Sequence, residues 1–376
     1  MARPRLVLAV LVFLLTIHGV AFGGGLSFDH NGAAAMGMAN AFAGVASDPS
    51  AIFYNPAGIT QLPGTQFLVG TSVVYLDTVF RSSTTGEPTH LEDQFPLVPH
   101  FYITHRFKSL NDRLSVGLGI YRPFGLLIDW PDNWQGRFDS IFAKLRVTVI
   151  NPTVALQVTP NLSVATGFRY ANVAAEFQQK FDAGTGESKA RVFDATANPI
   201  GWNVGLLYHA TETTAVGIQF RSEIQAKLNG SAEFSGPAAM LFANTAFHSS
   251  IKMPPQLVVG ISTKVIPRWR FNVDIEWQGW RTLGSIQNTL RRPHNPFSIS
   301  SCWIPRGRGF GTTRMFIDSE PSIQPPTRLP CAEAIITHSR PSRIIPSTRP
   351  FRSRISMPLQ VGLDILFLHS HSMFRI

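Results

Sequence analysis

The chain of 376 residues lacks the features that define helical membrane proteins and many soluble enzymes. No segment reaches the ~18 consecutive apolar residues that a transmembrane helix requires. Only two cysteines are present, Cys302 and Cys331, so the body before them needs no disulfide framework. That body also contains no Gly-x-Ser-x-Gly elbow and no phosphate-binding glycine loop. These absences leave a protein that crosses a membrane with strands as one open possibility.

The net charge of +10 is concentrated outside the body of the chain. Residues 286–376 contain 12 Arg, no Lys and 4 acidic residues, and they contribute +8. The other 285 residues hold 21 basic and 19 acidic side chains. Because the body is nearly neutral, the high pI is no argument for a nucleic-acid partner, and we expect none.

The first 23 residues have the pattern of an export signal. Arg3 and Arg5 precede the short apolar run from Leu6 to Ile17, and Ala21-Phe22-Gly23 is a small-x-small cleavage pattern. The run is too short to span a bilayer as a helix. We therefore expect residues 1–23 to be a cleaved signal peptide, with an uncleaved N-terminal anchor as the alternative.

Residues 24–62 are rich in Gly, Ala and Asn and show little alternation, which predicts short helices and turns. The triplet Asp48-Pro49-Ser50 fits a helix start, because Asp can cap free N–H groups and Pro is tolerated in the first turn. The helix should end at Asn55-Pro56, because proline disfavours a helical residue before it.

From Gln66 onward the hydrophobic pattern has a period of two, which is typical of strands. The clearest case is Trp269–Trp277, in which aromatic and aliphatic residues alternate with Arg270, Asn272, Asp274 and Glu276. At ~3.3 Å per residue the two Trp lie about 26 Å apart, close to the apolar band of an outer-membrane barrel once strand tilt is included. We expect the apolar face to contact lipid and the polar face to line a lumen.

The connections between strands alternate between short and long. Short turns are expected at residues 110–112, 159–161, 211–213 and 266–268, and longer polar connections at 81–95, 123–141, 181–190 and 229–251. This alternation is typical of transmembrane barrels, with short periplasmic turns and long extracellular loops. About nine strands are readable by Arg281.

One stretch after the signal peptide is more specific than the rest. It reads Met36-Gly37-Met38-Ala39-Asn40-Ala41-Phe42-Ala43-Gly44, then Asp48-Pro49-Ser50-Ala51-Ile52-Phe53-Tyr54-Asn55-Pro56-Ala57-Gly58-Ile59. This stretch resembles the N-terminal plug of the FadL/TodX family of outer-membrane transporters, with the Asn-Pro-Ala motif at Asn55, Pro56 and Ala57. Weaker matches follow in family order at residues 134–137, 151–152, 201–207, 220–222, 253–255 and 277–280. The resemblance covers roughly residues 24–285.

The resemblance implies an all-β protein: a transmembrane antiparallel β-barrel, fourteen-stranded in the family, whose lumen holds an N-terminal plug of short helices and turns. It implies passive transport of long-chain fatty acids or similar hydrophobic compounds across the outer membrane of a Gram-negative bacterium. We expect residues 24–62 to be the plug and 63–285 to be barrel strands. We also expect a monomer in contact with outer-membrane lipid and lipopolysaccharide, with no cofactor.

Two groups of residues are candidates for ligand binding. Phe28, Phe42, Phe53 and Tyr54 either line a pocket or form the small core of the plug. Arg137, Arg169 and Arg221 suit a fatty-acid carboxylate, because an Arg fork matches its two oxygens. The alternative for each Arg is an ion pair with a lumen acid such as Asp274 or Glu276. Two nearby histidines, His100 and His105, should face opposite sides of a strand, so we expect no metal site.

Other functions remain open at this point. The first is a channel for aromatic hydrocarbons, and the second is an outer-membrane enzyme that acts on lipid. The third is a barrel without transport activity, such as an adhesin. No residue pattern in the body points to catalysis, so we expect the protein not to be an enzyme.

The last 91 residues, 286–376, differ from the body. Eleven of them are Pro, and period-two alternation reappears only briefly near Val361–Phe367. Proline cannot donate to a sheet ladder, so we do not expect central barrel strands here. This tail is either a basic disordered extension or the product of a frameshift near residues 281–295.

Overall fold

The computed structural model describes residues 26–82, 85–108, 111–182, 184, 186–266, 269–280, 289–291, 297–304, 312–319 and 361–369. The expected signal peptide lies outside these ranges. Within them, no helix combines the length and the hydropathy needed to cross a membrane.

Short helices occupy the segment before the first strand. They are α2 (Ala33–Met36), α3 (Ala51–Tyr54) and the 3-10 helix η1 (Pro56–Gln61), and a further 3-10 helix, η3 (Pro237–Met240), lies in a later loop. The helix after Asp48 begins at Ala51 rather than at Pro49, because Asp48 Oδ1 accepts the Ser50 N–H at 2.8 Å in a local turn. Asn55 separates α3 from η1, as its position before proline predicts.

The strands follow from Thr65 onward. They are β1 (Thr65–Asp77), β2 (Val79–Arg81), β3 (Pro88–His90), β4 (Leu97–Phe107), β5 (Leu114–Asp129), β6 (Phe142–Thr159), β7 (Leu162–Asp182), β8 (Glu187–Ala197), β9 (Ile200–His209), β10 (Thr214–Arg221), β11 (Ile224–Ser235), β12 (Thr245–Met253), β13 (Gln256–Ile266), β14 (Trp269–Gln278), β15 (Thr289–Arg291), β16 (Phe297–Ile304), β17 (Thr312–Ser319) and β18 (Val361–His369).

Three pairs of these elements each form one interrupted long strand. Both β8 and β9 pair with β7, and they are separated by Asn198-Pro199. The pair β10 and β11 is interrupted at Ser222-Glu223, and the pair β12 and β13 at Pro254-Pro255. Proline cannot donate to the ladder, which accounts for two of these interruptions. Counted this way, the described body up to Gln278 contains nine long strands, which confirms the expected number.

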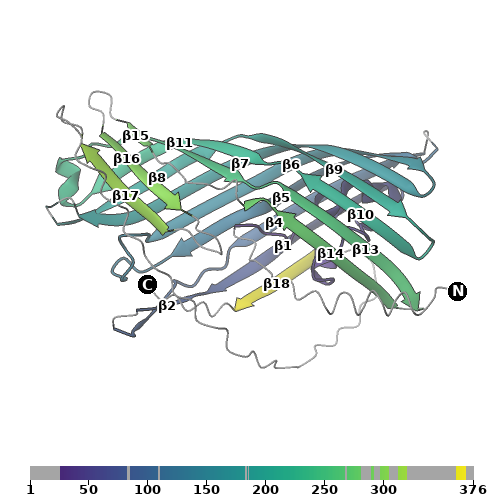
Figure 1. Ribbon diagram of the computed structural model, residues 1–376, viewed down its shortest axis with the longest axis horizontal. Helices are drawn as coiled ribbons and strands as arrows, with labels where there is room; N and C mark the ends of the chain where they lie inside the picture. Colours follow the sequence, from purple (N-terminus) through teal and green to yellow (C-terminus); the bar gives the residue numbers. More distant parts are fainter. Residues whose placement is uncertain are drawn as a thin grey trace.

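The long strands form one antiparallel, curled sheet in the order β14-β13-β10-β9-β7-β6-β5-β4-β1, with β8, β11 and β12 continuing it at one end. Figure 1 shows the strands running obliquely along the molecule. The sheet is a half-barrel, and among the described residues β13 is the one partner of β14. At the other edge β18 pairs with β1 in parallel, from Val69↔Val361 to Asp77↔His369. This parallel pair departs from the antiparallel pattern expected of the whole sheet.

Side chains alternate between the two faces of the sheet as the period of two predicts. On β14, Phe271, Ile275 and Trp277 are exposed on the convex face. On the concave face Asp274 accepts hydrogen bonds from the Phe42 and Ala43 N–H groups, at 2.9 and 2.8 Å. The expected division into a lipid-facing and a lumen-facing side is therefore confirmed for this strand.

Connections agree with the sequence only in part. Short connections lie at residues 159–161 and 211–213 as expected, whereas parts of the expected turns at 110–112 and 266–268 lie outside the described residues. The long connections expected at 123–141 and 229–251 are shorter, at 130–141 and 236–244, because β5 continues to Asp129, β11 continues to Ser235 and β12 begins at Thr245. The β2–β3 hairpin occupies the first expected long connection. The prediction of a long connection at 181–190 is wrong: β7 continues to Asp182 and β8 begins at Glu187. Gly184 and Gly186 have positive φ, 83° and 108°, which permits this tight turn between the two strands.

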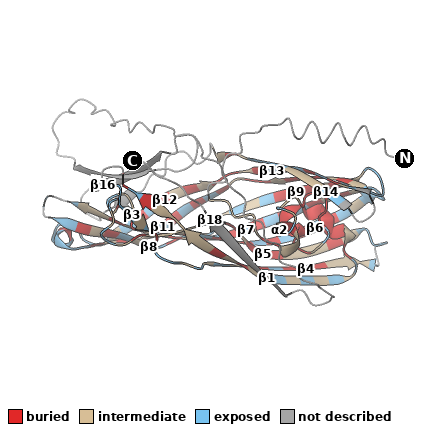
Figure 2. Ribbon diagram, turned by 90° about the horizontal axis from the view of Figure 1, so that it is seen from below, coloured by how far each residue is buried: buried red, intermediate tan, exposed pale blue. Residues whose placement is uncertain are grey.

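The concave face has two tiers of different character. Around residues 26–62 the inward side chains are small or polar, among them Ser72, Ser115, Asn151, Ser163, Asn203 and Gln219. Beyond this tier they are apolar, among them Val147, Val149, Ala171, Val173, Leu228 and Ile251. Figure 2 shows buried residues gathered around α2 and the strands beside it. The short helices thus fill one half of the half-barrel and leave the other half lined by apolar side chains.

The division of faces predicts the surroundings of single probes. With Cys302 and Cys331 replaced by Ser, a fluorophore on Phe271→Cys should be quenched strongly by lipid-attached quenchers. The same label on Asn272→Cys should be quenched far less, because Asn272 faces the plug and donates to Met38 Sδ. Equal quenching at the two neighbouring positions would contradict the assignment of the faces.

Candidate functional site

The plug, residues 26–62, sits against glycines of the wall. An added Cβ at Gly217 would overlap the Ala43 carbonyl, and one at Gly205 would lie 2.8 Å from the Pro56 ring. Across the sheet, an added Cβ at Gly119 would lie 3.0 Å from Ile52 Cγ2. At Gly217 only glycine fits, because the plug backbone approaches the strand closely, whereas at Gly205 and Gly119 the close neighbours include plug side chains.

The Ala43 peptide is held from both sides. Its N–H donates to Asp274 Oδ2 on β14 at 2.8 Å. Its carbonyl accepts from Asn55 Nδ2 at 2.8 Å, and the same amide nitrogen donates to the Leu206 carbonyl on β9 at 3.0 Å. Asn55 Oδ1 also accepts the Ala57 N–H at 3.2 Å. The side chain of the Asn-Pro-Ala motif therefore ties η1, the plug loop and the wall together.

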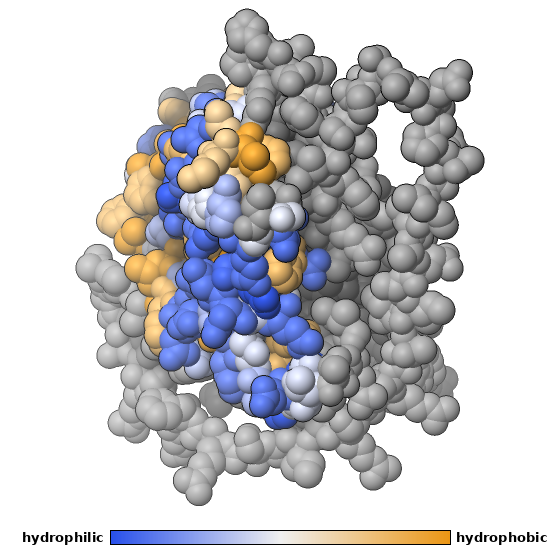
Figure 3. All heavy atoms as spheres, turned by 90° about the vertical axis from the view of Figure 1, so that its left-hand side faces the viewer, coloured by the Kyte–Doolittle hydropathy of each residue, from blue (hydrophilic) through white to orange (hydrophobic). Residues whose placement is uncertain are grey.

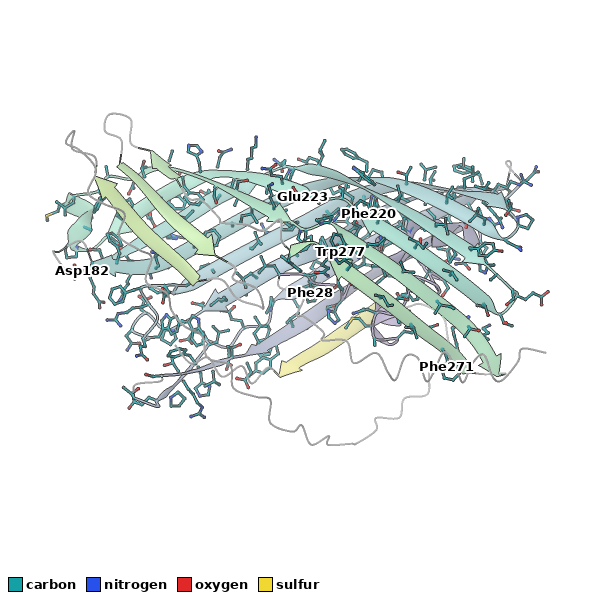
Figure 4. All side chains as sticks on the ribbon, in the orientation of Figure 1. Phe28, Asp182, Phe220, Glu223, Phe271 and Trp277 are labelled. Atoms are coloured by element: carbon teal, nitrogen blue, oxygen red, sulfur yellow. The ribbon has the colours of Figure 1, made fainter. Side chains whose placement is uncertain are left out.

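The first described residues are fastened to several strands. The Phe28 N–H donates to the Pro123 carbonyl at 2.7 Å, where the pairing of β5 with β6 shifts register. Ser27 Oγ accepts from Gln256 and Gln278 Nε2, at 3.3 and 3.2 Å. Figure 4 places Phe28 and Trp277 in the middle of the sheet, between Asp182 at one end and Phe271 toward the other.

A cavity of about 130 Å³ lies between the plug and strands β10, β13 and β14. The lining comes from Asp29, Ala39, Asn40, Ala41, Phe53 and Tyr54 of the plug, and from Gln219, Arg221, Val258, Asp274 and Glu276 of the wall. Ala39 and Asn40 have positive φ, 53° and 64°. Non-glycine residues rarely adopt this conformation, so the plug segment beside the cavity is strained.

Arg221 is the one cation lining this cavity. Its side chain is only 3% exposed, and Nη2 lies 3.9 Å from Glu276 Oε1. The guanidinium stacks over Phe53 with its Cζ 4.2 Å from the ring centre. Nε and Nη1 have no hydrogen-bond partner. A buried guanidinium with free N–H groups is costly, which favours an oxygen-bearing occupant next to it.

Acidic groups outnumber this cation around the cavity. Burial raises the pKa of Asp29 to about 6, and the nearby Glu276 carboxylate adds to the rise. Arg221 and the Ser27 hydroxyl, which donates to Asp29 Oδ1 at 3.2 Å, act in the opposite direction. Asp29 is therefore the carboxyl of the plug with a pKa nearest to neutral pH.

The structure brings only some of the predicted aromatic residues to the cavity. Phe53 and Tyr54 line it, with ring centres 4.8 Å apart at right angles. Phe42 is fully buried and packs edge-on against Tyr54, so it belongs to the plug core. Phe28 is half-buried and lies against His30 instead. Phe53 and Tyr54 thus line a cavity and Phe42 lies in the plug core, whereas Phe28 does neither, and ligand binding by this group stays a prediction.

The three predicted arginines lie in three different places. Arg137, in the loop after β5, forms an ion pair with Glu187 rather than facing the cavity. Arg169, on β7, is 1% exposed and donates from Nη1 to the Ser222 carbonyl at 3.2 Å, while Nε and Nη2 have no partner. Arg221 alone lines the cavity, beside Glu276 as the ion-pair alternative predicts.

Several residues at this site were not singled out from the sequence. Asp29 stands in a segment without periodicity, and Gln219 is one polar residue among many on inward faces. Asp274 and Glu276 were expected to face the lumen, but the sequence did not predict that Asp274 contacts Ala43 or that Glu276 lies near Asp29. The contacts join residues more than 200 positions apart, as in the bond from Ala43 to Asp274, which no local pattern encodes.

The end of the molecule opposite the plug is polar. Figure 3 looks onto this end, where hydrophilic residues gather over the middle and hydrophobic residues border them along one flank. Its ion pairs include Arg137–Glu187 and Lys189–Asp132, the second at 3.1 Å. Nowhere in the described part of the chain do three or more His, Cys, Asp or Glu side chains gather in a group able to hold a metal ion.

Together, a curled antiparallel sheet with an apolar convex face and a plug seated against its concave face define a plugged β-barrel of the outer membrane. The family model described as "Outer membrane protein transport protein (OMPP1/FadL/TodX)" matches residues 14–305, which include the whole stretch in which the resemblance is readable. The chain belongs to this family.

Individual relatives are distant. An outer membrane protein of Neisseria meningitidis is 26% identical over 250 residues, which cover 57% of this chain and about half, 52%, of that protein. The long-chain fatty acid transport protein of Escherichia coli K12 is 23% identical over 332 residues, 75% of this chain and 72% of that protein. The crystal structure of the Ralstonia pickettii toluene transporter TbuX superposes with a TM-score of 0.57 at 18% identity, covering 78% and 79% of the two chains.

The close contacts at the wall glycines predict that replacing one of these glycines by a larger residue dislodges the plug. Gly217→Val should destabilise the seated plug by about 1–3 kcal/mol, because the new side chain overlaps the Ala43 carbonyl. Limited proteolysis should then cleave within residues 26–62 faster than in the wild-type protein. Gly125→Ala is the matched control, since an added Cβ there lies 3.7 Å from its nearest neighbour. Equal protection of both variants would contradict the close seat.

Proposed function

We propose that this protein carries long-chain fatty acids, or similar hydrophobic compounds, passively across the outer membrane through its plugged barrel. The observation that supports this most strongly is the apolar character of the concave face beyond the plug. Val147, Val149, Ala171 and Val173 are fully buried there in an apolar cluster. An apolar solute that inserts among such side chains gains roughly 25 cal/mol for each Å² that it removes from water.

The polar tier beneath this lining suits the other end of such a ligand. Arg221 and Arg169 lie at or near the boundary between the two tiers, and each has N–H groups without a partner. An amphiphile with its chain in the apolar tier and an oxygen-bearing headgroup at Arg221 would satisfy both environments. The name of the Escherichia coli relative, a long-chain fatty acid transport protein, agrees with a ligand of this kind.

The plug provides the closure that such a path requires. The proposed plug spans residues 24–62 and the proposed wall spans residues 63–285. Contrary to the expectation that the tail adds no strands to the wall, β15 and β18 of the later chain pair with β12 and β1. In this scheme a ligand beside Phe53 and Tyr54 shifts the plug through Asn55, which joins η1 to the wall at Leu206. Transport then needs no energy source, no cofactor and no enzymatic step, and a monomer in outer-membrane lipid and lipopolysaccharide is sufficient.

Uptake of aromatic hydrocarbons is the second candidate. The toluene transporter TbuX shares the fold, and the apolar tier would accept a neutral ring equally well. A neutral ring, however, would leave the free N–H groups of Arg221 without a partner. This difference favours a ligand that carries a headgroup.

Uptake assays distinguish the two candidates. In a strain that lacks its own fatty-acid transporter, the full chain should restore uptake of labelled oleate and have little effect on toluene. The isosteric double variant Val147→Thr and Val173→Thr should lower oleate uptake several-fold, because a buried hydroxyl facing hydrocarbon costs about 1–3 kcal/mol.

The folding control is the matched variant Val147→Ile and Val173→Ile, which keeps the lining apolar and should retain uptake. Both variants must reach the outer membrane in equal amounts. No oleate uptake by the wild-type chain, or equal uptake by both double variants, would count against the proposal.

A further inference from the structure

The cavity at Arg221 has too many acids for a simple anion site. Four charged residues line it: Asp29 from the plug, Arg221 from β10, and Asp274 and Glu276 from β14. With every group ionised, the lining carries an excess of two negative charges. A bare carboxylate entering the cavity would raise that excess to three, and like charges at this range in a poorly solvated site repel strongly.

The free hydrogen-bonding atoms of the lining are of both kinds. Arg221 offers Nε and Nη1 as donors, whereas Asp274 Oδ1 and Gln219 Oε1 are buried acceptors without a partner. The carboxyl of Asp29 is a further acceptor when ionised. An occupant that satisfies this lining must both accept from Arg221 and donate to an oxygen. A carboxyl group that has its proton can do both, and a carboxylate cannot.

We propose that the cavity binds the headgroup of a carboxylic acid together with one proton, which the ligand shares with Asp29. The inference rests on the proposed function for the identity of the ligand. A carboxylate from solution and one proton from solvent enter together, and no covalent bond forms or breaks. The ligand then accepts from Arg221, and the O–H···O pair with Asp29 replaces a repulsion between two carboxylates.

The surroundings of Asp29 make it the group that takes the proton. Its pKa is raised to about 6 by burial and by Glu276, with Arg221 and Ser27 opposing. The Tyr54 hydroxyl, the other titratable group packed against this residue, donates to the Asp29 main-chain carbonyl at 2.6 Å rather than to its carboxyl. At pH 8 Asp29 is ionised and must gain a proton on binding. Below pH 6 it already has one.

Affinity should therefore depend on pH in a defined direction. One proton taken up on binding strengthens affinity by at most about tenfold for each pH unit of acidification. We expect laurate affinity to increase as the pH falls from 8 to 6. Below pH 6 the affinity should become constant, because the number of protons taken up on binding falls toward zero. A site built only from basic groups would show no proton uptake with an ionised ligand.

Calorimetry on the full chain in detergent tests this directly. Laurate is titrated at pH 5, 6, 7 and 8 in two buffers with different ionisation enthalpies, and the difference in heat gives the number of protons taken up. We expect close to one proton at pH 8 and close to none at pH 5. Dodecanol, which has no carboxylate, should bind without this dependence.

Variants separate the cavity from the titration of laurate itself. Asp29→Asn should abolish most of the proton uptake and bind laurate at pH 8 about as tightly as the wild type does at pH 6. Arg221→Gln should weaken binding at every pH. Glu223→Gln is the matched control, since Glu223 pairs with Lys252 at 3.8 Å and does not line the cavity. Figure 4 shows Glu223 beside the end of β10.

Two results would overturn the inference: laurate affinity without pH dependence in the wild type, or the same proton uptake in Asp29→Asn as in the wild type. Neither result affects the proposed function, which oleate uptake in cells tests separately. Conversely, proton-linked laurate binding without oleate uptake would support the site and reject the transport function.

Discussion

The structure depends on one constraint: a backbone polar group that faces lipid has no water to pair with, so every strand of the wall needs a partner. This constraint explains the long antiparallel ladders, which continue through β7 for 21 residues. It also explains why interruptions fall at Asn198-Pro199 and Pro254-Pro255, where a proline has no N–H to satisfy. The apolar convex face and the distinct concave face, which is polar around the plug and apolar beyond it, follow from the same arrangement, because side chains on a strand alternate.

The same wall determines how the plug is held. The glycines on β5, β9 and β10 leave room for the plug: its backbone approaches β10 at Gly217, and its side chains pack against the glycines on β5 and β9. Asn55 and Asp274 then hold the Ala43 peptide from opposite sides. The plug is fixed both by these hydrogen bonds and by apolar packing, in which Ile52 and Phe53 are buried in one cluster with wall residues such as Tyr121. The hydrogen bonds are the part of this attachment that a change at a small number of groups can release.

Local patterns predicted the class of the fold and the direction of side chains, because a period of two is a local property of a strand. Alternation from Phe271 to Trp277 was sufficient to assign lipid and lumen faces, and Pro56 was sufficient to end α3. The tight turn after Asp182 was missed, because polar residues there resemble a loop. The cavity was predicted only through Phe53, Tyr54 and Arg221. Asp29 was not predicted, since its role depends on Glu276, which folding alone brings next to it.

The central claim is that the plug must move for a hydrophobic ligand to pass. A reversible cross-link between plug and wall tests it, using Ile52→Cys with Gly119→Cys in a chain without Cys302 and Cys331. An added Cβ at Gly119 lies 3.0 Å from Ile52 Cγ2, which is close enough for a disulfide after small shifts. Oleate uptake should be lost when the disulfide forms and should return on reduction. Equal uptake in the oxidised and reduced states would contradict the account.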